Sequence, residues 1–241
     1  MKLNRLIVKV VTMLCVCGGS ALSLYPINRK FYNLIFICCL IGFGLGLLIL
    51  VWKRKYCRFA IMLVFVLVVI PFILPSKSID PSILREGYVD RLINLNGTKY
   101  VWGGENRWGI DCSGLPRKAF RDALLAYGLK NLNGAATRSF VENWWYDASA
   151  KALGQGYRNY TVVLELKGTV KEMDYSSLLP GDLAITEGGI HVLVYLGKSE
   201  WIQAAPEIGK VAIMNGREDK NRWLTVPVNT YRWSLLNKKS G

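Results

Sequence analysis

Three long apolar stretches come first along the chain, and shorter segments of mixed polarity follow them. None of the three contains a charged side chain, and they occupy residues 10–28, 31–52 and 59–75. Each is close to the roughly 20 residues that a helix needs to cross the hydrocarbon core of a bilayer. We therefore expect residues 1–75 to form a membrane anchor of three transmembrane helices.

The first stretch has a second interpretation. Basic residues followed by an apolar run also describe a signal peptide, and Lys2, Arg5 and Lys9 precede this one. No convincing small-residue cleavage site follows it, which favours a retained first span.

The distribution of charge predicts the topology of the anchor. Residues 1–75 hold nine Lys and Arg and no Asp or Glu, so most of the formal net charge of +14 lies there. Because basic flanks stay on the cytoplasmic side, we expect the N-terminus and the cluster at 53–58 inside. Three crossings then place residues 76–241 on the outer face of an inner or plasma membrane, with Arg29 and Lys30 also outside. The remaining positive charge is that of an ordinary solvated surface, and no nucleic-acid partner is expected.

Beyond a short polar linker at 75–81, the pattern changes from helical to alternating. Helical periodicity, and then short β-branched and aromatic runs, predict helices followed by strands. The expected helices are 82–94, 115–127 and 139–153, and the expected strands are 161–166, 183–186, 191–196, 201–205, 210–214 and 224–228. Helices first and an antiparallel sheet afterwards is an α+β arrangement, which we expect for a single domain at 76–241.

One cysteine stands apart from the others. Cys112 is the only cysteine after residue 75, so it has no disulfide partner in its own domain. It lies in Asp-Cys-Ser-Gly directly before a predicted helix, where unpaired backbone N–H groups and the helix dipole favour a thiolate and can hold an oxyanion. A buried inert thiol is the alternative for a lone cysteine.

A cysteine nucleophile needs an imidazole, and the chain has a single histidine, His191. It opens a predicted strand after Gly188-Gly189. Alone, such a histidine is more often structural, but together with Cys112 it indicates a catalytic base. Gln203 in the next predicted strand can accept a ring N–H and fix the tautomer.

Five ordered motifs resemble those of the NlpC/P60 family. They are Tyr-Val-Trp-Gly-Gly at 100–104, Asp-Cys-Ser-Gly-Leu at 111–115, Leu-Pro-Gly-Asp-Leu at 179–183, His-Val-Leu-Val-Tyr-Leu-Gly at 191–197 and Trp-Ile-Gln-Ala at 201–204. The resemblance covers roughly residues 80–215. It implies a papain-like fold, in which a helix bearing the cysteine packs on an antiparallel sheet bearing the histidine.

The resemblance also implies roles for individual residues. Cys112 matches the nucleophile, His191 the base and Gln203 the third polar residue. The expected activity is a cysteine peptidase that cleaves amide bonds in peptidoglycan stem peptides through an acyl-enzyme. No metal ion or other cofactor is expected.

Substrate contacts are expected from Tyr100, Asp111 and Ser113, which match family positions beside the cysteine. Asp111 can alternatively be a helix N-cap. Core packing is the alternative for Tyr100, Trp102 and Trp108.

Two other functions stay open. An acyltransferase or amidase on the same fold could act on a membrane-proximal substrate, because an amine or a lipid hydroxyl can resolve an acyl-enzyme. A non-catalytic membrane scaffold is the third class, which the intact set of polar site residues disfavours.

The chain departs from a minimal member of that family in two places. The long separation of Cys112 and His191 indicates an insertion near 129–168, whose aromatic run at 144–146 forms either a ligand-binding wall or part of the core. Pro116 is expected to bend the helix that follows the cysteine.

Overall fold

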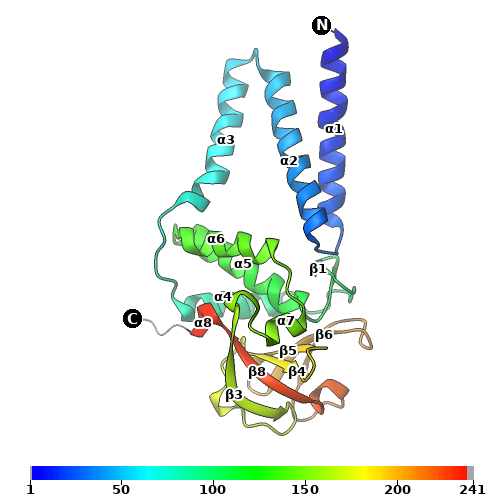
Figure 1. Ribbon diagram of the computed structural model, residues 1–241, viewed down its shortest axis with the longest axis vertical. Coiled ribbons are helices and arrows are strands. Elements are labelled where there is room, and N and C mark those ends of the chain that lie inside the picture. The colour runs from blue at the N-terminus through cyan, green and yellow to red at the C-terminus, as the bar shows by residue number, and fades with distance from the viewer. Residues whose placement is uncertain (1, 238–241) are drawn as a thin grey trace.

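Three long helices stand on a mixed domain in the computed structural model, which describes residues 2–237 (Figure 1). The helices are α1 (Lys2–Leu24), α2 (Lys30–Val51) and α3 (Lys55–Ile73), and each is long and apolar enough to cross a membrane. The start of α1 and the turn between α2 and α3 lie at one end, far from the domain (Figure 1). Residues 238–241 of the expected domain at 76–241 lie outside the described residues.

The first two helices pack closely, whereas the third diverges. Gly46 of α2 is buried against Thr12 of α1, and a Cβ on Gly46 would lie 2.0 Å from the Thr12 hydroxyl oxygen. This contact therefore requires a glycine. α3 separates from α2 toward the domain (Figure 1), and none of its described residues is buried.

The domain begins with a helical layer. Asp80 caps α4 (Pro81–Ile93) by accepting hydrogen bonds from the backbone N–H groups of Ser82 at 2.8 Å and Ile83 at 3.2 Å. α5 (Gly114–Lys130) follows, and Pro116 lies in its first turn, where the backbone N–H has no helical partner to lose. Pro116 therefore costs α5 no helical hydrogen bond, and the expected bend stays a prediction.

The single helix expected at 139–153 is also wrong, because two helices occupy this part of the chain. α6 (Gly134–Trp145) ends where Tyr146 becomes extended, and Ser149 starts α7 (Ala150–Gly154) by accepting from the backbone N–H of Ala152. The short polar segment between them supplies the cap that separates the two helices.

A six-stranded antiparallel sheet forms the second layer, with strand order β3-β8-β4-β5-β6-β7. The strands are β3 (Thr161–Thr169), β4 (Leu183–Thr186), β5 (Val192–Gly197), β6 (Glu200–Ala205), β7 (Lys210–Asn215) and β8 (Pro227–Trp233). The expected strand at 224–228 is wrong. Asn221 caps a short 3-10 helix, η3 (Arg222–Leu224), and β8 starts only at Pro227.

Further 3-10 turns are η1 (Tyr157–Asn159) and η2 (Tyr175–Ser177), and β1 (Glu105–Asn106) and β2 (Gly109–Ile110) form a separate small hairpin. A last helical turn is α8 (Ser234–Asn237).

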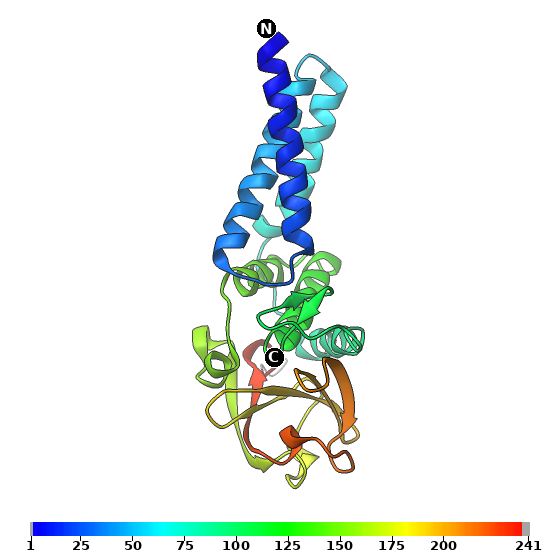
Figure 2. The ribbon, with the colours of Figure 1, turned by 90° about the vertical axis from the view of Figure 1, so that its right-hand side faces the viewer.

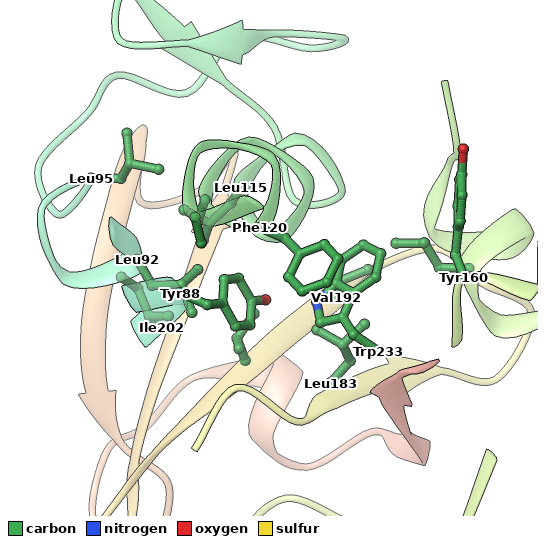
Figure 3. Packing of buried hydrophobic residues seen from close by; sticks show 14 of the residues in the cluster. Tyr88, Leu92, Leu95, Leu115, Phe120, Tyr160, Leu183, Val192, Ile202 and Trp233 are labelled. Atoms are coloured by element: carbon green, nitrogen blue, oxygen red, sulfur yellow. The ribbon is translucent and has the colours of Figure 1, made fainter. Parts of the chain in front are cut away.

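The main core lies between the helices and one face of the sheet (Figure 3). Phe120 of α5 stacks on Trp233 of β8 with ring centroids 4.3 Å apart, and Tyr88 of α4 meets Phe120 edge to face at 5.5 Å. Asp182, fully buried before β4, accepts two hydrogen bonds from Arg232 at 2.7 and 2.6 Å. The helix that follows Cys112 is thus fixed on an antiparallel sheet, as the expected α+β class requires.

The domain is packed against the ends of the three apolar helices and is joined to them by more than the connecting segment (Figure 2). The connecting segment is itself held by the domain: Asn133, just before α6, donates to the carbonyl oxygens of Lys77 at 3.2 Å and Ser78 at 3.1 Å. α6 contacts the ends of two membrane helices: the Thr137 hydroxyl donates to the Pro71 carbonyl at 2.6 Å, and Asn33 of α2 donates to the Trp144 carbonyl at 3.2 Å.

Candidate active site

The loop before Cys112 is shaped by close backbone packing. A Cβ on Gly114 would lie 2.2 Å from the Gly104 carbonyl oxygen, and one on Gly104 would lie 2.5 Å from the Gly109 carbonyl oxygen. Both positions therefore require glycine. The same Gly104 carbonyl accepts the backbone N–H of Asp111 at 3.0 Å, so the Gly-Gly and Cys-Ser-Gly motifs build one folded loop.

The Asp111 carboxylate caps the start of α5 and joins it to this loop. It accepts backbone N–H groups from Gly103 at 2.8 Å, Ser113 at 3.0 Å and Gly114 at 2.6 Å, and the Ser113 hydroxyl at 3.1 Å. Burial raises the pKa of Asp111, although these hydrogen bonds oppose the shift. In this conformation the carboxylate and the Ser113 hydroxyl hold each other, and the expected substrate contacts of both residues stay predictions.

Cys112 lies just ahead of α5 and is 8% exposed. Its thiol donates to the carbonyl oxygen of Ile190 at 3.8 Å, so it touches the residue directly before His191. Burial, reinforced by the nearby Asp111 charge, raises the pKa of the thiol to about 12, while backbone N–H groups of Val192 and Ser113 oppose the shift. Burial thus outweighs the backbone N–H groups and keeps Cys112 a neutral thiol, contrary to the thiolate expected from its position.

His191 lies at the entrance to β5 and is 2% exposed. Its Nε2 atom is 2.5 Å from the Oε1 atom of the fully buried Gln203 on β6. The imidazole also stacks on the indole of Trp223 in η3, with ring centroids 4.1 Å apart and planes at 15°. Burial lowers the pKa of His191 to about 4, against the opposing effect of the Gln203 hydrogen bond, so the ring is neutral near pH 7.

The contact with Gln203 determines which ring nitrogen carries the proton. A carbonyl oxygen can only accept, so Nε2 of His191 is the donor. In the neutral ring Nδ1 then has the free lone pair and can accept a proton. The amide nitrogen of Gln203 is directed to the Met214 sulfur at 2.9 Å, which is consistent with this orientation.

Tyr100 lies near the same site on the loop before Cys112. Burial raises the pKa of Tyr100 to about 12, and the neighbouring acidic groups add to the shift, so the phenol stays protonated. Its backbone is fixed by an N–H donated to the Gly209 carbonyl at 2.8 Å. The structure thus gathers Cys112, His191, Gln203 and Tyr100 in one region between α5 and the sheet.

Several expected aromatic positions lie elsewhere. Trp102 and Trp108 are 77% and 63% exposed, so core packing is wrong for both. Trp144 faces the membrane helix α2, with its ring 6.4 Å from that of Phe36. Tyr146 lies between two cations, Lys30 at 5.1 Å and Arg158 at 3.7 Å. The aromatic run at 144–146 therefore contacts α2 through Trp144 and also packs against the main core through Tyr146.

Two residues beside His191 were not singled out from the sequence. The Thr186 hydroxyl accepts the backbone N–H groups of Ile190 at 3.1 Å and His191 at 2.9 Å, and so fixes the turn that carries the imidazole. Trp223 covers the imidazole, and the Arg222 guanidinium lies 4.2 Å from the centre of the indole. Neither has a sequence signal: Thr186 is one of many strand-ending threonines, and Trp223 lies outside the five motifs.

The sequence pattern of the NlpC/P60 family matches residues 97–226, more than half of the chain. Among curated proteins, no sequence matches this chain.

Solved structures with similarity to this chain include NlpC2 from Trichomonas vaginalis, with 20% identity over 64% of this chain and 48% of that chain and a TM-score of 0.41. The peptidoglycan hydrolase RipB from Mycobacterium tuberculosis has 22% identity over 62% of this chain and 65% of that one, with a TM-score of 0.38. The P60 domain of antigen MAP1204 from M. avium subspecies paratuberculosis has 20% identity over 62% of this chain and 95% of that domain, with a TM-score of 0.38. This chain thus matches about half of the length of the Trichomonas protein.

The matched segment contains Cys112, His191 and Gln203 together with the loop that carries Tyr100. It includes α5 and every strand of the large sheet except β8, which starts at its end. The chain therefore belongs to the NlpC/P60 family.

Proposed function

We propose that this protein is a membrane-anchored cysteine hydrolase that cleaves amide bonds in peptidoglycan stem peptides. The observation that carries the proposal is the placement of the Cys112 thiol against the carbonyl of Ile190, directly before a histidine whose Nε2 is bound by Gln203. Membership in the NlpC/P60 family and the similarity to a peptidoglycan hydrolase, RipB, support the choice of substrate.

The proposed reaction starts from two neutral groups. Rotation of the Cys112 side chain away from the Ile190 carbonyl lets Nδ1 of His191 accept the thiol proton while the sulfur attacks the amide carbonyl carbon. The resulting imidazolium donates this proton to the leaving amine, and a thioester acyl-enzyme remains. Water then attacks the thioester with His191 as base, which releases the carboxylic acid and restores the thiol.

Oxyanion stabilisation is assigned to groups beside the sulfur. The Ser113 and Gly114 N–H groups are bound by Asp111, which leaves the Cys112 N–H as the nearer backbone candidate. The Tyr100 phenol is a second donor, because its pKa of about 12 keeps it protonated across the working range.

A transferase is the second candidate, and one observation favours it. Cys112 and His191 are only 8% and 2% exposed, so an acyl-enzyme formed there is shielded from water. An amine or lipid hydroxyl delivered with the substrate could then resolve the thioester in place of water.

The experiment that tests the proposal uses the full chain in lipid nanodiscs and purified muropeptides. Mass spectrometry should show stem-peptide fragments separated by hydrolysis, and Cys112→Ala should produce none. Products extended by an added amine, and not hydrolysed, would establish the transferase instead. Intact muropeptides at all enzyme concentrations would contradict both.

The outer-face location is part of the proposal. A periplasm-active reporter fused after residue 80 should be active, whereas one fused at Lys55 should not. The opposite pattern would place the domain in the cytoplasm and exclude the cell wall as substrate.

A further inference from the structure

Two exposed tryptophans lie on the loop that leads to Cys112, and nothing in their own domain covers them. Trp102 is 77% and Trp108 63% exposed, and Arg107 between them is also exposed. Large aromatic side chains are rarely left in water without a partner. The question is therefore which partner this surface meets.

The backbone beside Trp108 is bonded directly to the end of a membrane helix. The Oδ1 atom of Asn106 accepts the N–H of Trp108 at 2.8 Å, and its Nδ2 atom donates to the carbonyl oxygens of Tyr25 at 2.8 Å and Leu24 at 3.5 Å. Leu24 is the last residue of α1. A single asparagine side chain thus separates Trp108 from the point where α1 ends.

The two residues that follow Trp102 contact the same turn. The carbonyl of Gly103, the next residue, accepts the N–H of Asn28 at 3.3 Å, and Ile27 pairs with Gly104 as an isolated β-bridge. Asn28 lies just before α2. Figure 1 shows β1 directly beneath the ends of α1 and α2, where this contact lies.

These contacts fix the level of the two tryptophans relative to a bilayer. If α1 and α2 cross the hydrocarbon core, the turn at 25–29 lies in the headgroup layer, and the backbone of the loop bonded to it, which carries both tryptophans, lies close to that depth. Exposed aromatic side chains lie at this level too: Tyr25 in the turn is 43% exposed, and Phe31 in the first turn of α2 is 66% exposed. Tryptophan and tyrosine prefer this layer, where an apolar ring meets lipid and a polar N–H or O–H meets water.

We propose that Trp102, Arg107 and Trp108 form a lipid-binding surface that inserts into the headgroup layer of the bilayer crossed by α1 and α2. The indoles lie among the glycerol and headgroup atoms, and the Arg107 guanidinium binds lipid phosphate, for which its planar set of N–H donors is suited. The surface itself does not depend on the proposed hydrolase activity.

The consequence for substrate choice does rest on the proposed function. Asp111 bonds the N–H of Gly103 at 2.8 Å, so the loop seated in the headgroups is the one that caps α5 beside Cys112. The nucleophile is then held at the membrane surface, where a peptide joined to a lipid is within reach and a distant wall layer is not.

The test measures the depth of individual tryptophans in the full chain. The protein has eight tryptophans, which 5-fluorotryptophan labelling and single Trp→Phe variants resolve and assign by fluorine NMR in nanodiscs. With lipids that carry a spin label on the headgroup, the resonances of Trp102 and Trp108 should broaden as much as that of Trp52 at the far end of α2. Trp201 and Trp233, both fully buried in the domain, should stay sharp.

A water-soluble relaxation agent supplies the opposing outcome. If it broadens Trp102 and Trp108 while the lipid label does not, the two side chains face water as walls of a substrate groove, and the proposal is wrong. Arg107→Gln should also reduce the broadening of Trp108 by anionic spin-labelled lipid, whereas Lys167→Gln on β3 should not. Because neither measurement requires turnover, an inactive enzyme would not affect the outcome.

Discussion

The three apolar helices and the NlpC/P60 domain use the same kinds of apolar side chain in opposite ways. On α3, Leu63 and Phe65 are 59% and 68% exposed, whereas Trp201 and Trp233 in the sheet are fully buried. The exposed side chains of α3 are stable only if lipid surrounds them, while those of the sheet are covered by the chain itself. An unbroken apolar run therefore indicates a segment surrounded by lipid, whereas alternation of apolar and polar residues indicates a strand with one face in the core.

The contact between the two regions is of a third kind. It consists largely of hydrogen bonds to backbone groups, such as Glu105 N–H to the Pro26 carbonyl at 2.8 Å and Gly134 N–H to the Pro75 carbonyl at 3.1 Å. The buried Glu105 also binds Asn28 in the turn and Arg121 in α5, the latter at 2.9 Å. These hydrogen bonds thus connect the turn at 25–29 to the loop before Cys112. No apolar pattern in the sequence predicts them.

The largest expected effect comes from the catalytic region alone. Cys112→Ser should lower hydrolysis of stem peptides by roughly 10⁴-fold or more, as for other nucleophiles that act with a base. Thermal unfolding should change little, because the substitution is small. Turnover by the serine variant near the wild-type rate would remove Cys112 from the mechanism.

The next effect distinguishes the base from the residue that orients it. His191→Ala should cost as much as loss of Cys112, since the two act as a unit. Gln203→Ala should cost less, roughly 10- to 100-fold, because second-shell partners orient the ring without taking a proton. Kinetics with a soluble stem peptide would measure both, and a larger loss for Gln203→Ala would reverse the two roles.

Stability against pH tests the burial of His191. The native ring has a pKa of about 4, below its ordinary value of 6.5, so only the unfolded chain binds a proton between these values. The free energy of unfolding should therefore fall as the pH drops from 6.5 toward 4, by up to about 1.4 kcal/mol per unit. His191→Gln should remove this component, since it is the only histidine. The free energies of unfolding of both proteins should be measured by urea unfolding at several pH values. The same pH dependence in both would contradict a buried neutral ring.

The smallest effect is confined to the membrane region. Gly46→Leu should separate α1 from α2, because Thr12 already occupies the space, and overpacking of this kind costs about 1–3 kcal/mol. Gly44→Leu is the matched control, since a Cβ there meets nothing within 4 Å. Thermal unfolding in bicelles should distinguish the two variants, and equal melting temperatures would show that the helices do not pack as described.

The sequence predicted the three long helices from their unbroken apolar runs and most strands from their local alternation. The strand expected at 224–228 failed because an Asn221 cap forms a 3-10 turn before Pro227, and capping overrides alternation. The helix expected at 139–153 failed for the same reason at Ser149.

The site followed a similar division. Cys112, His191 and Gln203 could be proposed because residue types and motif order single them out. The surroundings of these residues could not be predicted. Burial of the Cys112 thiol and stacking of Trp223 on the imidazole depend on segments far apart in the sequence. Docking of α6 on the membrane helices is equally invisible, because carbonyl oxygens such as those of Pro71 and Trp144 carry no sequence signal.

The most direct test of the central claim is to trap the acyl-enzyme. The full chain in nanodiscs should be mixed with a stem peptide, quenched in acid and digested, and the peptide that contains Cys112 should be examined by mass spectrometry. The account predicts an added mass equal to the acyl portion of the substrate on Cys112, absent from Cys112→Ala and abolished by hydroxylamine. Cleavage of the stem peptide by Cys112→Ala, with no adduct on the wild-type thiol, would contradict it.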